Sequence, residues 1–270
     1  MERQPQILDI EQVIIAKGGE KAKRIPKFVI RWFKKFIHQD FINGFLKEGY
    51  VGVEFCENTL KYLGVEIEVE GLENIPKDGR TYTFVSNHPL GAIDGVTLGA
   101  VIGREYDGKI RYLMNDILMH LKGMAPLGIP INKLGGQARN LPKLLKEVYE
   151  SDNQMLVFPA GLCSRKIDGK IQDVEWGKSF IKLSRDTGRD IIPIHFDGTN
   201  SKRFYRIARL QKLLGLKFNI AMMLLPDEMY RSKGRKYKIT IGKPIAIDSL
   251  DKSRSDKEWA QEIRKHVYEL

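Results

Sequence analysis

Cysteines are scarce in this 270-residue sequence, and long apolar runs are missing. The two cysteines, Cys56 and Cys163, are too few for a disulfide framework or a four-cysteine zinc site. A reducing, cytosol-facing compartment is therefore expected. The opening stretch MERQPQILDIEQV lacks the basic start and apolar core of a secretory signal. No run approaches the roughly 18 to 20 apolar residues that span a bilayer, so any membrane contact is expected at its surface.

Acidic residues are the minority among the charges. The chain has 34 Asp and Glu against 45 Lys and Arg, which gives a formal net charge of +11. A field of that sign favours anionic partners such as nucleic acid, an anionic membrane, or acidic and phosphorylated substrates. The sequence has no RNP-like or zinc-finger pattern, so nucleic acid is not an expected partner. Hydrophobic residues make up 42% of the chain, which is enough for one sizeable core.

Basic and aromatic residues gather between residues 21 and 47, a segment with eight Lys or Arg and one acidic residue. Phe28, Trp32 and Phe36 recur at helical spacing, and Pro26 suits a helix start. An aromatic face opposite a basic face is typical of a helix that lies in the headgroup region of a membrane. The alternative is an amphipathic helix docked on its own domain.

A second basic stretch covers residues 202–217, with six Lys or Arg and no acidic residue. Leu210, Leu213 and Leu214 give it an apolar face. A solvated helix and a second surface against anionic lipid are both compatible with this pattern.

Strand-like and helical patterns alternate after about residue 50. The strand patterns cover residues 65–71, 81–86, 110–115, 154–159, 190–196, 218–225 and 236–242. The helical patterns cover 51–64, 94–103, 139–149, 176–187 and a C-terminal segment capped by Ser255 with Glu258. Such alternation predicts an α/β fold with a mostly parallel sheet covered by helices. We assign residues 51–270 to this domain and residues 1–50 to an N-terminal amphipathic helical segment at the membrane surface.

A histidine follows one predicted strand, in the stretch SNHPLGAIDG that begins at Ser86. The ordinary pKa of a histidine, roughly 6.5, suits His88 to act as a general base near neutral pH. A carboxylate on the second ring nitrogen would fix the tautomer and stabilise the imidazolium. Asp94 is the nearest candidate, because the Pro and Gly between them allow a tight turn. The alternative is a structural histidine beside a turn aspartate.

Small, hydroxyl and basic residues follow two further strand-like runs. Ligands of open α/β sheets bind at the carboxyl ends of the strands, a glycine allows close backbone approach, and an arginine can hold phosphate oxygens. These residues are therefore candidate substrate ligands, although solvated loop cations are the alternative. They are Pro159, Gly161, Ser164, Arg165 and Lys166 after the run QMLVF, and Lys133 and Arg139 after the run GIPI.

In this order the motifs resemble the lysophospholipid acyltransferase superfamily, which includes the bacterial 1-acylglycerol-3-phosphate acyltransferases. The resemblance covers about residues 62–245, and the order of its four blocks is more specific than any block alone. The blocks are an Asn-His followed by an Asp (Asn87, His88, Asp94); an apolar-Ile-Asp-Arg sequence (PINK, with Lys133); Phe-Pro-Glu-Gly followed by a Ser and a basic residue (Phe158, Pro159, Gly161, Ser164, Arg165); and a hydrophobic strand with proline (IIPIHF, with Pro193).

Two features depart from the pattern of that superfamily. Five residues separate His88 from Asp94 where the family has four, and one added residue rotates a helical side chain by about 100°, so the turn must differ. Ala160 stands where the family has Glu. The missing carboxylate indicates either a rearranged site or an acceptor other than plain lysophosphatidic acid, such as a lyso-aminolipid with an N-acyl amino acid, in a divergent bacterial branch. Lysophosphatidic acid and a lyso-aminolipid both stay open as acceptors.

The resemblance implies a membrane-associated O-acyltransferase of lipid biosynthesis, located peripherally on the cytoplasmic face of the bacterial inner membrane. His88 would deprotonate a hydroxyl of a lyso-lipid, Asp94 would orient His88, and the oxygen would attack the thioester of an acyl-carrier protein or coenzyme A. The resemblance implies no covalent acyl-enzyme, metal or cofactor, and its partners are an anionic membrane surface, the acceptor and the acyl donor. Substrate binding would fall to Asn87, Lys133, Arg139, Phe158, Pro159, Gly161, Ser164, Arg165 and Lys166.

Three alternatives stay open from the residues alone. Cys163 beside the third block allows a thiol-dependent thioesterase or ping-pong transferase. A basic lipid-surface-binding relative without catalytic activity is the second alternative. A catalytic part for His195, which follows IIPI at a strand end, is the third alternative, although we expect this histidine to be structural.

Overall fold

The computed structural model of the chain describes residues 2–131, 137–215 and 220–270. Its helices are α1 (Ile10–Ala22), α2 (Lys27–Phe36), α3 (Gln39–Leu46), α4 (Val53–Leu63), α5 (Ile93–Glu105), α6 (Gln137–Tyr149), α7 (Ser179–Thr187), α8 (Lys202–Leu213), α9 (Leu225–Arg231) and α10 (Asp256–Glu269). Its strands are β1 (Glu66–Glu70), β2 (Thr83–Ser86), β3 (Ile110–Asn115), β4 (Gly128–Ile131), β5 (Gln154–Val157), β6 (Arg165–Ile167), β7 (Lys170–Gln172), β8 (Ile191–Asp197) and β9 (Lys236–Ile241).

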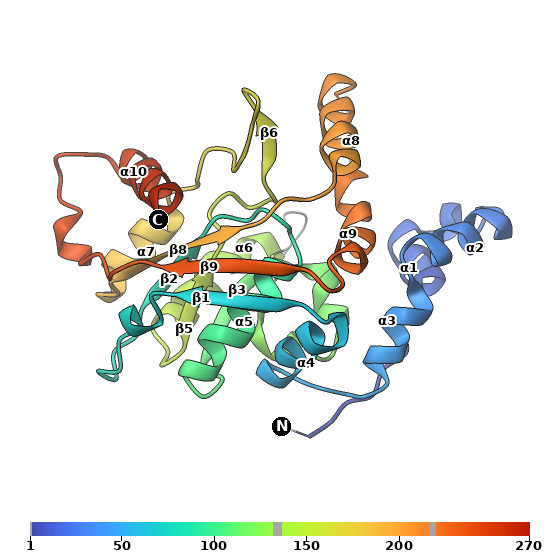
Figure 1. Cartoon of the computed structure of the whole chain (residues 1–270), viewed down its shortest axis with the longest axis horizontal. Helices are drawn as coiled ribbons and strands as arrows, with labels where there is room; N and C mark the ends of the chain where they lie inside the picture. Colours follow the sequence, from blue (N-terminus) through green and yellow to red (C-terminus); the bar gives the residue numbers. More distant parts are fainter. Residues whose placement is uncertain (1, 132–136, 216–219) are drawn as a thin grey trace.

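A seven-stranded sheet forms the centre of the molecule, in the order β1-β9-β8-β2-β5-β3-β4 (Figure 1). Its neighbouring strands run parallel, except for the pair β8 and β9. Adjacent residues of β2 belong to different cores, with Phe84 in one and Val85 in the other. Inner strands of a parallel sheet are buried on both faces and are therefore mostly apolar, which explains the apolar runs. The predicted α/β class with a mostly parallel sheet is confirmed.

Helices cover both faces of this sheet. On one face, Phe55 of α4 and Ile102 of α5 belong to the larger core. On the other, Phe180 of α7 and Ile263 of α10 belong to the second core. Figure 1 shows α4 and α5 below the sheet and α7 and α10 above its left end. The predicted capping box of α10 is present, because Ser255 and Glu258 each accept the other's backbone N–H.

One predicted strand, over residues 218–225, is wrong for the part that the structure describes. Residues Ile220–Leu224 form a 3-10 helix, and α9 follows. Ala221 and Leu224 are both buried, three residues apart, beside Phe204 of α8. That spacing belongs to a helical turn, and Pro226 stands in the first turn of α9, where proline is tolerated. An unbroken apolar run does not by itself separate these two outcomes.

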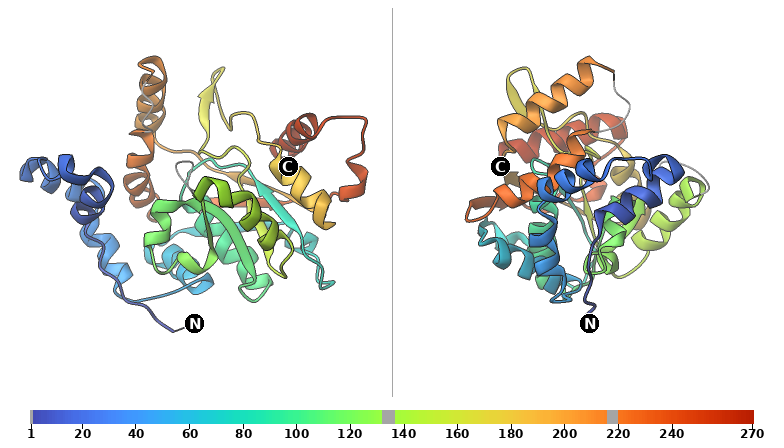
Figure 2. Two further views of the ribbon diagram at one scale, coloured as in Figure 1. Left: turned by 180° about the vertical axis from the view of Figure 1, so that it is seen from behind. Right: turned by 90° about the vertical axis from the view of Figure 1, so that its right-hand side faces the viewer.

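The N-terminal helices extend beyond the end of the sheet where β2 and β8 finish (Figures 1 and 2). Helix α2 begins directly after Pro26, as the sequence predicts. It exposes 69% of Phe28 and 62% of Trp32, whereas Ile30 is buried. Among the residues with a described position, none belongs to a helix that is long and apolar enough to cross a bilayer.

Candidate active site

His88 and Asp94 lie in contact between the end of β2 and the first turn of α5. Nδ1 of His88 is 3.0 Å from Oδ2 of Asp94, at ion-pair distance, but the ring N–H does not point straight at that oxygen. Asp94 is fully buried, and 17% of the His88 side chain remains exposed. The phenyl ring of Phe158 stacks on the imidazole with its centroid 4.1 Å away. The imidazole is therefore held between a carboxylate and an aromatic ring, with limited access to solvent.

A tight turn accommodates the extra residue between the histidine and the aspartate. Oδ2 of Asp94 accepts the backbone N–H groups of Leu90 and Gly91 at 2.9 and 3.0 Å, and its Oδ1 accepts that of Gly95 at 2.9 Å. Gly91 has φ of +79°, and a Cβ there would lie 3.0 Å from Leu225 and 3.1 Å from Cys163. Glycine suits this positive φ, and any larger residue would be strained there and would press on both side chains. These hydrogen bonds hold the loop around the carboxylate, which therefore reaches the imidazole despite the longer spacing.

The two titratable groups stabilise each other's charged forms. Burial by itself would lower the pKa of His88, but the carboxylates of Asp94 and, to a smaller extent, Asp173 together outweigh it, so this pKa lies above the ordinary value of a histidine. Burial would raise the pKa of Asp94, but His88 and the backbone N–H groups lower it. Asp94 therefore stays ionised, and the imidazolium that forms after proton uptake is stabilised.

Asn87 joins β2 to β8 rather than facing open space. Its Nδ2 donates to the carbonyl of Phe196 at 2.9 Å, and its Oδ1 accepts the N–H of Phe196 at 2.7 Å. The side chain is buried, with 2% exposed. Both polar ends of the amide are engaged, so Asn87 fixes the backbone from which His88 projects.

The third block closes against the histidine. The backbone N–H of Ser164 donates to the carbonyl of His88 at 2.7 Å, and the buried Ser164 hydroxyl donates to Asp173 at 2.6 Å. The carbonyl of Pro159 accepts the N–H of Gly177 at 2.9 Å. Most of these groups shape the loop instead of pointing to a ligand.

The basic residues that were predicted to bind substrate lie in several different parts of the chain. The guanidinium of Arg165 donates to the carbonyl of Cys163 at 2.6 Å and lies over the ring of Phe204. Lys166 is exposed on the β6–β7 hairpin, and Gly161 is exposed in the preceding turn. Lys133 lies outside the described residues. Arg139 is in α6, but its side chain is not described, so the assignment of both as substrate ligands stays a prediction.

Sequence reasoning missed Asp173, a fully buried carboxylate between β7 and α7. Its Oδ1 accepts the backbone N–H of His88 at 3.2 Å as well as the Ser164 hydroxyl, and its Oδ2 accepts Nε1 of Trp176 at 2.9 Å. The backbone N–H of Asp173 in turn donates to the Tyr268 hydroxyl of α10 at 2.8 Å. No motif marks this residue, because its link to His88 spans 85 positions of sequence.

The family follows from a match along nearly the whole chain. The model of a family described as Acyltransferase matches residues 12–270. The chain is a member of this acyltransferase family. A lyso-glycine lipid O-acyltransferase of Bacteroides thetaiotaomicron is 49% identical over 266 residues, 98% of this chain and 97% of that protein. One of the same name from Phocaeicola vulgatus is 48% identical over 98% of this chain and 95% of its own length.

A solved structure shows the same fold. The crystal structure of the 1-acyl-sn-glycerophosphate (LPA) acyltransferase PlsC from Thermotoga maritima superposes with a TM-score of 0.52 at 18% identity, over 96% of this chain and 93% of that one. Together with the family match, this confirms the resemblance to the lysophospholipid acyltransferase superfamily and the prediction that the protein is an acyltransferase.

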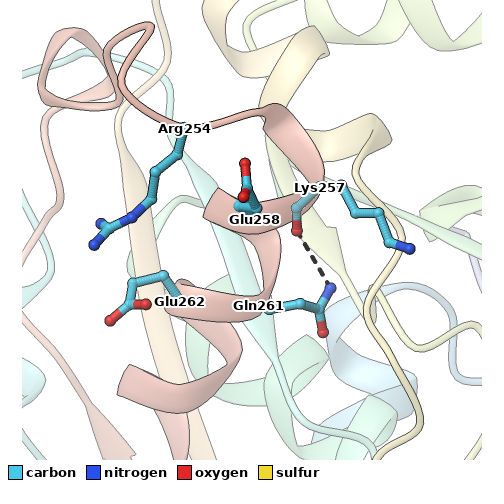
Figure 3. Close-up of a pocket in the computed structure, with 5 residues that line it drawn as sticks. All are labelled: Arg254, Lys257, Glu258, Gln261 and Glu262. Atoms are coloured by element: carbon cyan, nitrogen blue, oxygen red, sulfur yellow. Dashed lines mark hydrogen bonds between the residues drawn. The ribbon is translucent and has the colours of Figure 1, made fainter.

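A surface pocket of this acyltransferase lies elsewhere, along α10. Figure 3 shows its lining, in which polar and charged side chains project from one side of the helix and from the residues before it. None of the predicted site residues lines it. Its lining is Arg254, Lys257, Glu258, Gln261 and Glu262.

Cys163 is poorly suited to thiol catalysis in this acyltransferase. Its side chain is buried, and its Sγ accepts a hydrogen bond from Arg165 at 3.2 Å. Burial raises the pKa of the thiol, although the neighbouring Arg165 opposes this, so the reactive thiolate is disfavoured. We expect Cys163→Ser to retain kcat within about threefold, because Ser can still accept from Arg165. A loss above about 10²-fold at an unchanged melting temperature would instead show nucleophilic catalysis by the thiol.

Proposed function

We propose that this acyltransferase moves a fatty acyl chain from an acyl-carrier-protein or coenzyme A thioester to the free hydroxyl of a lyso-glycine lipid. The contact between His88 and Asp94 carries the chemical part of this proposal, because it pairs a base with an orienting carboxylate beside the end of a strand. The two relatives of that name support this acceptor, since each is nearly half identical over 98% of this chain. It also agrees with Ala160, which leaves the third block without the carboxylate of phosphate-specific relatives.

The proposed reaction needs one base and no covalent intermediate. With Nδ1 of His88 turned to Asp94, Nε2 is left to take the proton of the acceptor hydroxyl. The oxygen attacks the thioester carbonyl, the new C–O bond forms, and the C–S bond breaks. The departing thiolate takes the proton back from Nε2, which restores the neutral imidazole. The carboxylate of Asp94 stabilises the imidazolium between these two steps.

We propose that the protein works on the cytoplasmic face of the bacterial inner membrane, held there from the surface. Helix α2 supports this, since it exposes Phe28 and Trp32 and contains no acidic residue. Its cations include Lys27, Arg31 and Lys35, with Arg24 before it, whereas Lys34 pairs with Asp9 and Glu11. Aromatic rings at the headgroup level and cations towards anionic lipid are the pattern of interfacial helices. A net charge of +11 also suits an acidic carrier protein as donor.

The acceptor is tested with purified protein and a panel of lyso-lipids. We expect kcat/KM for lyso-glycine lipid to exceed that for lysophosphatidic acid by at least about tenfold, because a site built for one polar head discriminates against another. Acyl-carrier-protein and coenzyme A thioesters serve as parallel donors. Equal or higher activity on lysophosphatidic acid would contradict the assignment. Lipid profiling of cells without the gene should then show the lyso-glycine lipid accumulating.

A further inference from the structure

Helix α8 is buried at its base and exposed at its tip. Ser201 caps its start by accepting the N–H of Phe204, and Phe204 itself is fully buried. At the other end, 54% of Leu210, 73% of Leu213 and 62% of Leu214 are exposed. Figure 1 shows the helix standing away from the sheet. Exposing three large apolar side chains to water does not stabilise a domain. Such a group on a projecting helix end therefore indicates an interaction surface.

The charges of α8 all have one sign. Arg206, Arg209 and Lys212 are exposed, and none of the three forms an ion pair with a residue that the structure describes. The stretch 202–217 has no acidic residue. Arg206, Arg209, Leu210 and Leu213 follow helical spacing, so cations and leucines share the outward face. This combination fits a surface that is both anionic and apolar just beneath, which is the headgroup boundary of a bilayer.

The base of α8 adjoins the base of α2. The guanidinium of Arg203 in α8 lies 5.4 Å from the ring of Phe36, the last residue of α2, and bonds to Asp227 of α9. His38, which follows α2, places its Nε2 2.8 Å from the other oxygen of Asp227. The C-terminal end of α2 and the N-terminal end of α8 therefore meet at one anchored point. Their exposed ends lead away from it in different directions: α2 lies beyond the end of the sheet where β2 finishes, and α8 stands above that end (Figures 1 and 2).

We propose that α8 is a second membrane-contacting arm, which enters the headgroup region with Leu210, Leu213 and Leu214 while α2 enters with Phe28 and Trp32. The inference rests on the proposed function in one respect, since a lipid acceptor gives the protein a reason to bind a bilayer. Two arms from one anchored point would fix the orientation of the sheet end relative to the membrane, which a single amphipathic helix leaves free to roll.

The exposed leucines favour a bilayer over the other anionic partner of this protein. Cations alone would be enough to bind an acidic carrier protein. The three leucines would find only a polar surface there. A bilayer accepts both, because leucine enters the acyl boundary while Lys and Arg remain at the anionic headgroups.

Vesicle flotation of the full-length protein tests this arm without any substrate. Leu210, Leu213 and Leu214 are replaced together by Gln, which keeps helix propensity, and Leu72→Gln is the control at an exposed leucine far from α8. On phosphatidylcholine vesicles that contain phosphatidylglycerol, we expect the triple variant to lose about tenfold in partition coefficient and the control to match the parent. A second variant with Gln at Arg206, Arg209 and Lys212 should lose binding only when phosphatidylglycerol is present.

Unchanged partitioning of both α8 variants would overturn the proposal. It is also wrong if the leucine variant binds vesicles normally but turns a self-associated protein into a monomer in sedimentation, or raises only the KM for an acyl-carrier-protein donor. Acyl transfer to detergent-dispersed acceptor should be unchanged in both variants. If the parent fails to acylate lyso-glycine lipid while the leucine variant still loses vesicle binding, the proposed acceptor fails and the arm stands.

Discussion

Replacing His88 by Ala is expected to lower kcat for acyl transfer by about 10³-fold, with the fold retained. A positioned general base contributes typically 10²- to 10⁴-fold, and an alanine leaves no group to take the hydroxyl proton. The loss should appear in kcat more than in KM, because the imidazole acts on the reacting proton and not on the lipid chain. Steady-state kinetics with thiol release as the signal measure both.

His266→Ala provides the matched control, since this exposed histidine of α10 should leave kcat unchanged. If His88→Ala transfers acyl chains as fast as the parent, the proposed base is wrong. Asp94→Asn should also be impaired, by about 10²-fold, because Asn cannot stabilise the imidazolium. Circular dichroism and the melting temperature show whether either variant has merely unfolded.

The rate of acyl transfer by the parent protein should rise with pH on the acid side, or acid limb, of its pH–rate profile, as His88 loses its proton. Only the neutral imidazole can accept a proton, and Asp94 holds the pKa of His88 above the ordinary value of about 6.5. Activity should therefore fall as pH drops through that raised pKa. In Asp94→Asn the raising carboxylate is gone while burial still lowers the pKa of His88, so the limb should move to lower pH even though the rate is smaller.

The sheet was predictable because its residues obey a local rule. The inner strands are short apolar runs buried on both faces, and β1 and β9 show the alternation of half-buried strands. Every predicted strand segment except 218–225 overlaps a strand of the sheet. Residues 218–225 also contain an apolar run, but Ala221 and Leu224 bury one side of a helical turn, and an apolar run alone does not separate the two outcomes. The β6–β7 hairpin had no such run, since its short strands are polar and half exposed, and it was not predicted.

The candidate site was predictable where its residues are neighbours in sequence. His88 and Asp94 lie within one short loop, so their types and closeness in sequence, together with the family resemblance, favoured a pair, although their spacing departs from that of the family. Tertiary partners were not predictable in this way. Ser164 was expected to bind substrate, but its hydroxyl donates to Asp173, and Asn87 donates to and accepts from β8. Only the fold brings such residues together, and the sequence carries no spacing that marks them.

Asp173 connects three residues that are far apart in sequence, and a substitution there tests whether these connections matter. It holds the backbone of His88, the hydroxyl of Ser164 and the indole of Trp176 with one carboxylate. Burial raises its pKa, and the hydrogen bonds from Ser164 and Trp176 oppose that rise, so ionisation depends on keeping all of them. Asp173 thus acts as a positioning residue for the loop of His88, and its charge also helps to raise the pKa of His88.

We expect Asp173→Asn to lower kcat by about 10²-fold and the free energy of unfolding by about 1–3 kcal/mol, because one donor is left facing an NH₂ group in a buried site. Its acid limb should also shift to lower pH, since an anion near His88 has been removed. Asp168→Asn is the matched control, as this exposed residue lies in the turn of the β6–β7 hairpin and Asn tolerates its positive φ. A stability loss of the expected size with an unshifted acid limb would mean that Asp173 only supports the fold. An unshifted limb with full activity would mean that the loop of His88 does not depend on this carboxylate.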